Sequence, residues 1–197
     1  MVRSVFFSFH YQRDIMRVQV VKNHYITKGN YTAAGFFDGS LEEKSQREGD
    51  AAVKRLIDNG LKGTSVTCVL IGHETYKRRW VDYEILKSIE MGHGVFGIRI
   101  HQIKDFRNGA VDSWGANPFS YLGYGTKGSL LRPMIKYTEG WAEAPYLLPI
   151  SRDSAHYLPA TGGPVLDGLF NVYDWVTDDG YNHFADWVEL AAWQAGR

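Results

Sequence analysis

The stretch "SVTCVLIGHETYKRRWVDYEI", Ser65 to Ile85, joins an apolar segment to a charged one. Its first part is a short β-branched run bounded by glycines, which predicts a buried strand. In the second part Val81 and Ile85 are four residues apart and Ile89 continues the row, which predicts a helix with one face in the core. A strand followed by a helix is the repeating unit of α/β proteins.

Trp80 and Glu84 lie about 100° around this helix from the core-facing row, one above the other by the same four-residue spacing. The pattern places both side chains at the border between the buried face and solvent. Because the helix follows a strand, its first turn is expected near the carboxyl edge of the sheet, where open parallel sheets bind ligands. The alternative interpretation is an ordinary surface glutamate beside a half-buried tryptophan.

The same strand and helix patterns alternate on both sides of this stretch. Strands are expected over 2–9, 33–38, 64–72 and 94–100, and helices over 14–26, 49–60 and 78–92. The glycines Gly60 and Gly92 are expected to end the second and third helices. Strands that alternate with helices in this way predict a parallel sheet covered on both faces.

The alternation weakens in the C-terminal third. Residues 104–129 are expected to form a long loop that is functional or mobile, including "GYGTKGS", and "TGGP" (161–164) is also assigned to a loop. Residues 132–150 could hold one or two strands around a turn at Glu139-Gly140. Residues 172–193 are typical of two short helices broken at Asp178-Asp179-Gly180. No linker is evident, so a single domain over 1–197 is the simplest organisation.

Composition excludes several classes of protein. The 22 basic and 22 acidic residues balance, so no overall field attracts nucleic acid or an anionic membrane. The one cysteine, Cys68, excludes an internal disulfide, and it lies in a predicted strand as inert core. The seven histidines are scattered without metal-ligand spacing, so no metal site is expected. No secretory leader or membrane span is evident, so a cytoplasmic protein is expected.

Five segments together resemble one family. In order they are "VFFSFHYQ", "TSVTCVLIG", "RRWVDYEI", "NPFSYLGY" and "VYDWVTDDGYN", and Trp80 to Glu84 matches the Trp-x-x-x-Glu motif of the TIR domain. The whole chain resembles, more narrowly, the TIR-like ThsB proteins of the bacterial Thoeris anti-phage system. That resemblance implies a flavodoxin-like, three-layer α/β fold with a mostly parallel central sheet and an elaborated C-terminal third.

The resemblance also implies chemistry on NAD, which is a substrate, with no separate cofactor. Glu84 matches the family's catalytic glutamate. It is expected to bind the nicotinamide ribose and to stabilise the positive charge that develops as the bond to nicotinamide lengthens. Attack by a ribose hydroxyl of the same ADP-ribose would give a cyclic ADP-ribose isomer. In Thoeris systems such a product activates a separate ThsA-like effector, and a phage protein or self-association could switch the enzyme on.

The substrate-binding candidates are Ser8, Phe9, His10, Asp38, Arg79, Trp80 and Asn117. Ser8, Phe9 and His10 end the first predicted strand, and aromatic rings there could keep water from the reacting sugar. Phe6 and Phe7 are neighbours on that strand, so at least one belongs to the core. Asp38 could orient a ribose or simply start a turn, and Asn117 could close over the substrate or form an Asn-Pro turn. Arg79, with Lys77 and Arg78, could neutralise the diphosphate or belong to a solvated basic patch.

Two other functions remain open at this point. The chain could be a non-catalytic TIR module that self-associates or senses a phage protein, and then replacing Glu84 by Gln would change nothing. It could also resemble a nucleoside deoxyribosyltransferase, which uses a carboxylate at a sugar C1 on a related fold. A panel of free nucleosides and NAD would separate that enzyme from a TIR enzyme.

Overall fold

The computed structural model describes residues 3–28, 32–35, 41–155, 158 and 165–197. Within this part of the chain the central sheet has five strands in the order β2-β1-β3-β4-β9, and all neighbours are parallel. The strands are β1 Ser4–Ser8, β2 Thr32–Ala34, β3 Val66–Ile71, β4 Gly94–Arg99 and β9 Val172–Asp174. Parallel neighbours need crossover connections, and helices provide those that join the first four strands. The expected α/β, flavodoxin-like fold is confirmed.

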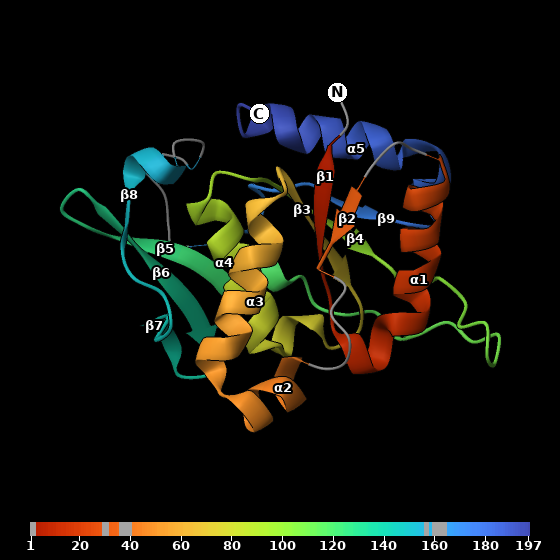
Figure 1. Cartoon of the computed structure of the whole chain (residues 1–197), viewed down its shortest axis with the longest axis horizontal. Helices are drawn as coiled ribbons and strands as arrows, with labels where there is room; N and C mark the ends of the chain where they lie inside the picture. Colours follow the sequence, from red (N-terminus) through yellow and green to blue (C-terminus); the bar gives the residue numbers. More distant parts are fainter. Residues whose placement is uncertain (1–2, 29–31, 36–40, 156–157, 159–164) are drawn as a thin grey trace.

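Helices cover both faces of this sheet (Figure 1). On one face lie α1 Tyr11–Lys28 and α5 Gly180–Gln194, and on the other lie α3 Asp50–Lys62 and α4 Arg79–Glu90. Successive residues of β1 point to opposite faces, so Phe7 packs with α1 and α5 while Phe6 packs with α3. Both phenylalanines are therefore core. No described helix is long and apolar enough to cross a membrane.

The helix α4 begins after a short 3₁₀ turn, η1 Thr75–Lys77, and Arg78 in extended conformation precedes it. Val81, Ile85 and Ile89 are buried, as the pattern predicts. The helix ends at Glu90, and Gly92 with a φ of 70° takes the chain away in a conformation that favours glycine. This is the helix that carries the Trp-x-x-x-Glu motif.

A second, antiparallel sheet packs against α4 and accounts for the elaborated C-terminal third (Figure 1). Its strands are β5 Leu122–Lys127, β6 Leu130–Tyr137, β7 Gly140–Glu143 and β8 Ile150–Ser151, and β6 pairs with the other three. The turn predicted at Glu139-Gly140 joins β6 to β7, and Gly140 has a φ of 124°. The hydroxyl of Tyr124 on β5 donates to the Leu86 carbonyl of α4 at 3.2 Å.

Several elements differ from the sequence prediction in their boundaries or type. The helix α3 runs through Gly60 to Lys62, because buried Leu61 continues the row of Val53 and Ile57. "GYGTKGS" contains most of β5, whose strand state depends on pairing with β6. Residues 172–174 form β9 beside β4, so one helix, α5, replaces the expected two. The polar helix α2 Leu41–Glu48 was not expected. "TGGP" lies outside the described residues.

The segment 104–116 contains no helix or strand. Arginine side chains from α1 and β4 form hydrogen bonds with it. Arg13 donates two 2.8 Å hydrogen bonds to the carboxylate of Asp112, and Arg17 donates to the Ile103 and Ala110 carbonyls. Arg99 donates to the Gly115 carbonyl at 2.7 Å. A 3₁₀ turn, η2 Pro118–Tyr121, then leads into β5, and a further one, η3 Arg152–Ala155, follows β8. The long loop expected over 104–129 therefore ends at η2.

Candidate active site

The candidate site is built around a hydrogen bond between β1 and α4. The Ser8 hydroxyl donates to Oε2 of Glu84 at 2.5 Å, and the two side chains are 0% and 2% exposed. Ser8 is the last residue of β1, so the contact lies at the carboxyl edge of the parallel sheet. Open α/β sheets bind ligands at this edge. A short bond to a buried carboxylate fixes its orientation.

Glu84 lines a small cavity of about 20 Å³. The other lining residues are Phe9, His10, Tyr11, Leu41, Arg78, Trp80 and Val81. A volume of that size holds about one water molecule. The structure thus brings Glu84, Ser8, Phe9, His10 and Trp80 together around a cavity that, among the described residues, is too small for a dinucleotide.

Trp80 and Glu84 are more deeply buried than the helical pattern indicated. Trp80 is 3% exposed and packs with Phe6 and the apolar face of α3, and its ring meets that of Tyr83 edge-on at 6.1 Å. The expected position at the solvent border is wrong, because α3 and the β5–β6 hairpin enclose α4 on the sides away from the central sheet. A shielded carboxylate acts more strongly on a nearby charge than a solvated one.

Arg79 points away from the cavity that Glu84 lines. Its guanidinium donates to both carboxylate oxygens of Asp50 at 3.1 and 2.9 Å and to the Ser45 hydroxyl at 2.9 Å. It also lies 4.6 Å from the centre of the Trp80 ring. Arg78 lines the cavity, and its Nη2 lies 3.1 Å from Glu74. Of the three basic residues Lys77, Arg78 and Arg79, only Arg78 therefore lines the cavity around Glu84.

The two remaining candidates lie elsewhere. Asn117 precedes η2, where its side chain accepts from the Phe119 amide at 3.2 Å and donates to Asp167 at 3.0 Å. It does not line the cavity around Glu84. With these contacts Asn117 begins the 3₁₀ turn η2, as in the turn that its Asn-Pro sequence had offered as one alternative. Asp38 lies outside the described residues.

Sequence reasoning missed two buried carboxyl groups. Burial raises the pKa of Asp14 on α1 to about 7, and the charge of Asp112 adds to that shift. Burial alone raises the pKa of Asp82 on α4 to about 7. The absence of a side chain at Gly72 admits Asp14, since a Cβ there would lie 2.2 Å from Oδ2. Asp82 follows Val81 of the apolar row of α4, and this position in the sequence could have indicated that it is buried.

Other reactive groups do not join the site. Cys68 is fully buried in β3, and burial raises the pKa of its thiol well above the ordinary value. Within the described residues no three His, Cys, Asp or Glu side chains are grouped as metal ligands would be. The described part of the site therefore offers a carboxylate, a hydroxyl, an imidazole, a guanidinium and aromatic rings for chemistry.

Together, the fold and the site define a flavodoxin-like α/β protein with a buried glutamate at the ligand-binding edge of its sheet. Residues 6–105 match the family model described as "Thoeris protein ThsB, TIR-like domain". A Bacillus cereus (strain MSX-D12) protein named "Putative cyclic ADP-D-ribose synthase ThsB1" is 49% identical over 200 residues, which cover 95% of this chain and 100% of that relative. The chain belongs to the TIR-like ThsB family of the Thoeris system.

Proposed function

We propose that this protein is a TIR enzyme that cleaves NAD between nicotinamide and ribose and closes the ADP-ribose into a cyclic isomer. The buried Ser8–Glu84 hydrogen bond at the carboxyl edge of the sheet carries the proposal. The family and the name of the 49% identical relative support the same reaction class. The cyclic product would act as a second messenger in anti-phage defence.

One carboxylate suffices for the cleavage. Nicotinamide is a pyridinium in NAD, and it takes the bond electrons and leaves as a neutral molecule, so no acid has to protonate it. Ordinary glycoside hydrolysis needs a second carboxyl group for that purpose. Glu84, oriented by Ser8, would bind the hydroxyls of the nicotinamide ribose and stabilise the positive charge that develops at C1.

Cyclisation requires that a ribose hydroxyl reaches C1 before water does. The walls contributed by Phe9, Tyr11, Leu41 and Trp80 favour this outcome because they leave little room for water beside the carboxylate. The attacking hydroxyl forms a new C–O bond and loses its proton. His10 lines the same cavity and is 5% exposed, so it is our candidate to accept that proton.

The cavity of about 20 Å³ must widen before NAD can enter. A site that is closed in the free chain is consistent with an enzyme that needs a trigger or self-association before it turns over. We include in the proposal a phage-derived trigger and a ThsA-like effector that responds to the product.

The deciding experiment is mass spectrometry of small molecules from phage-infected cells that carry the wild-type chain or Glu84→Gln. We expect nicotinamide and a cyclic ADP-ribose isomer with the wild type and neither above background with the variant. Equal defence by both proteins, with no product from either, would instead support the non-catalytic TIR module. Turnover of free nucleosides without NAD would support the deoxyribosyltransferase alternative.

A further inference from the structure

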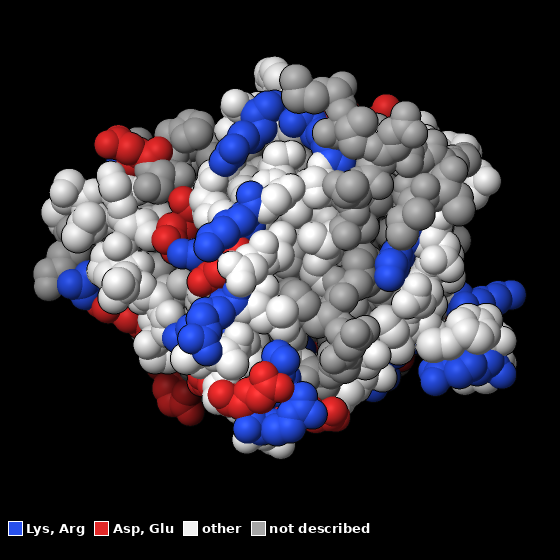
Figure 2. Space-filling view, in the orientation of Figure 1, with Lys and Arg blue, Asp and Glu red and all other residues white. Residues whose placement is uncertain are grey.

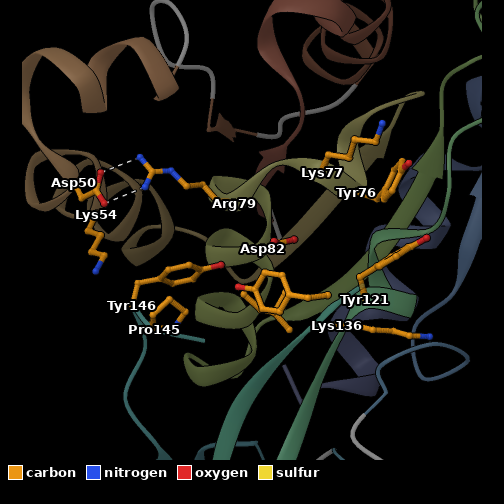
Figure 3. Close-up of a pocket in the computed structure, with 12 residues that line it drawn as sticks. Asp50, Lys54, Tyr76, Lys77, Arg79, Asp82, Tyr121, Lys136, Pro145 and Tyr146 are labelled. Carbon is orange, nitrogen blue, oxygen red and sulfur yellow. Dashed lines mark hydrogen bonds and ion pairs between the residues drawn. The ribbon is translucent and has the colours of Figure 1, made fainter. Parts of the chain in front are cut away.

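A second and larger cavity lies on another side of α4. Its volume is about 570 Å³, within the range of roughly 300–1,000 Å³ that is usual for small-molecule sites. Residues of α3, η1, α4, β6 and the segment around Tyr146 line it (Figure 3). Asp82 and Glu84 are two positions apart and so point about 200° apart around the helix. The two cavities therefore use different faces of the same helix.

Two polar atoms in the wall of this cavity lack partners. Oδ1 of Asp82 and the hydroxyl oxygen of Tyr146 are buried, and neither has a hydrogen-bond partner among the described residues. Figure 3 shows the Tyr146 hydroxyl directed toward the middle of the cavity, below Asp82. Burial and the nearby charge of Asp82 raise the pKa of Tyr146, so its hydroxyl keeps its proton. Buried groups of this kind usually have partners, so the wall offers a donor and an acceptor to a ligand.

Three lysines line the same cavity, and none forms an ion pair with a described residue. They are Lys54 of α3, Lys77 of η1 and Lys136 of β6. Figure 3 shows them on different sides of the cavity. Asp50 also lines it, but its charge is paired with Arg79 at 2.9 Å. On the face shown in Figure 2, acidic and basic side chains are mixed. The 22 basic and 22 acidic residues of the whole chain balance, so the lysines at the cavity are not part of a general positive charge. The cavity therefore favours an anion.

Aromatic rings form much of the remaining surface. The rings of Tyr76 and Tyr121 lie 5.1 Å apart at an angle of 33°, and the Lys77 ammonium lies 5.3 Å from the centre of the Tyr76 ring. Lys54 lies 5.8 Å from the ring of Tyr146. Tyrosine faces bind planar heterocycles by stacking, and lysines beside them bind phosphate.

We propose that this cavity is a second nucleotide site, which binds a nucleoside diphosphate with its base against the tyrosines and its phosphates at the lysines. The buried oxygen of Asp82 and the hydroxyl of Tyr146 would bind the polar edge of the base or the ribose. The site is separate from the cavity around Glu84 and does not depend on the reaction proposed there.

Isothermal titration calorimetry on the full chain carrying Glu84→Gln tests this site without turnover. The probes are ADP, adenosine and inorganic phosphate at low salt. We expect ADP to bind at least tenfold more tightly than either fragment, because only ADP contacts rings and lysines together. Raising the salt concentration should weaken ADP binding, since exposed lysines are screened.

Three further proteins locate the binding. Lys54→Gln with Lys136→Gln should weaken ADP at least tenfold, whereas Lys104→Gln, an exposed lysine that does not line the cavity, should leave it unchanged. Both changes replace side chains that are not fully buried, and a melting curve will confirm folding. His10→Ala is the matched change in the other cavity.

The proposal is overturned by any of three results. The first is that ADP does not bind the Glu84→Gln chain. The second is that ADP binds no better than adenosine alone or phosphate alone. The third is that the affinity for ADP survives the double lysine change. Loss of ADP binding only in His10→Ala would place the nucleotide beside Glu84 instead. None of these results bears on whether the wild-type enzyme makes a cyclic product, so failure here leaves the proposed function standing.

Discussion

Asp82 and Glu84 occupy the same turn of α4, and both carboxyl groups are buried, at 8% and 2% exposure. Glu84 accepts a hydrogen bond from Ser8, whereas Asp82 Oδ1 has no partner in the described residues. One helix can thus present carboxyl groups to two cavities. Glu84→Gln and Asp82→Asn can therefore serve as controls for each other, because each change removes an ionisable group and keeps the size of the side chain.

Glu84→Gln removes the charge and keeps the shape. Losing ~3–4 kcal/mol of transition-state stabilisation lowers the rate of nicotinamide release by about 10²–10³-fold. The melting temperature should stay close to that of the wild type, since the amide can still accept from Ser8. Asp82→Asn is the control and should keep the rate. A Glu84→Gln chain that melts much earlier but retains its rate per folded molecule would make Glu84 a structural residue.

Ser8→Ala leaves the Glu84 carboxylate without the hydrogen bond that orients it. A bond to a charged group contributes about 1.5–3 kcal/mol, so we expect kcat to fall by roughly 10–100-fold with a smaller change in KM. Ser88→Ala is the matched control. Ser88 is also buried on α4 and bonded to Thr67 and to the Glu84 carbonyl, but it does not line the cavity. Ser88→Ala should lower the free energy of unfolding and leave kcat unchanged. Equal loss of kcat in both variants would mean that Ser8 acts only through folding.

Trp80→Ala should destabilise the protein. The ring is 3% exposed and packs between Phe6 and α3, and deleting a buried ring of this size costs about 3–5 kcal/mol. Trp193 on α5 is 75% exposed, so Trp193→Ala should change the free energy of unfolding by less than ~0.5 kcal/mol. Urea unfolding of the two variants measures the difference. A Trp80→Ala chain as stable as the wild type would show that the ring is not part of the core.

The sequence predicts the elements whose pattern is local. β3 and α4 follow from an apolar run and a row at four-residue spacing, and both occur where expected. β9 has three residues and is a strand only because β4 pairs with it, and α2 has no apolar row to reveal it. The sequence pattern predicted that Ser8 and Glu84 lie at one edge of the sheet, but it did not predict how deeply they are buried. That burial depends on α3 and the β5–β6 hairpin, which pack around α4 through contacts between segments distant in the sequence.

The stability of the protein should depend on pH through Asp82. Burial raises the pKa of Asp82 to about 7 in the folded chain, whereas an aspartate ionises near ~3.9 in an unfolded one. Between these two values the folded state keeps a proton that the unfolded state has lost. The free energy of unfolding therefore falls as the pH rises through this window, by up to about 1.4 kcal/mol per pH unit, and changes no further on this account above pH ~7.

Asp82→Asn removes this dependence, because an amide does not ionise. Relative to the wild type, the variant should gain stability as the pH rises from 5 to 8, and urea unfolding at the two pH values measures the gain. Asp14, whose pKa burial also raises to about 7, is present in both proteins, so its contribution cancels. Asp153→Asn changes an exposed aspartate and should follow the wild type at both pH values. If the difference between wild type and Asp82→Asn is the same at pH 5 and pH 8, Asp82 is already ionised at pH 5. The folded chain then stabilises that charge, and the wall of the cavity contains a buried carboxylate anion instead of a neutral carboxyl group.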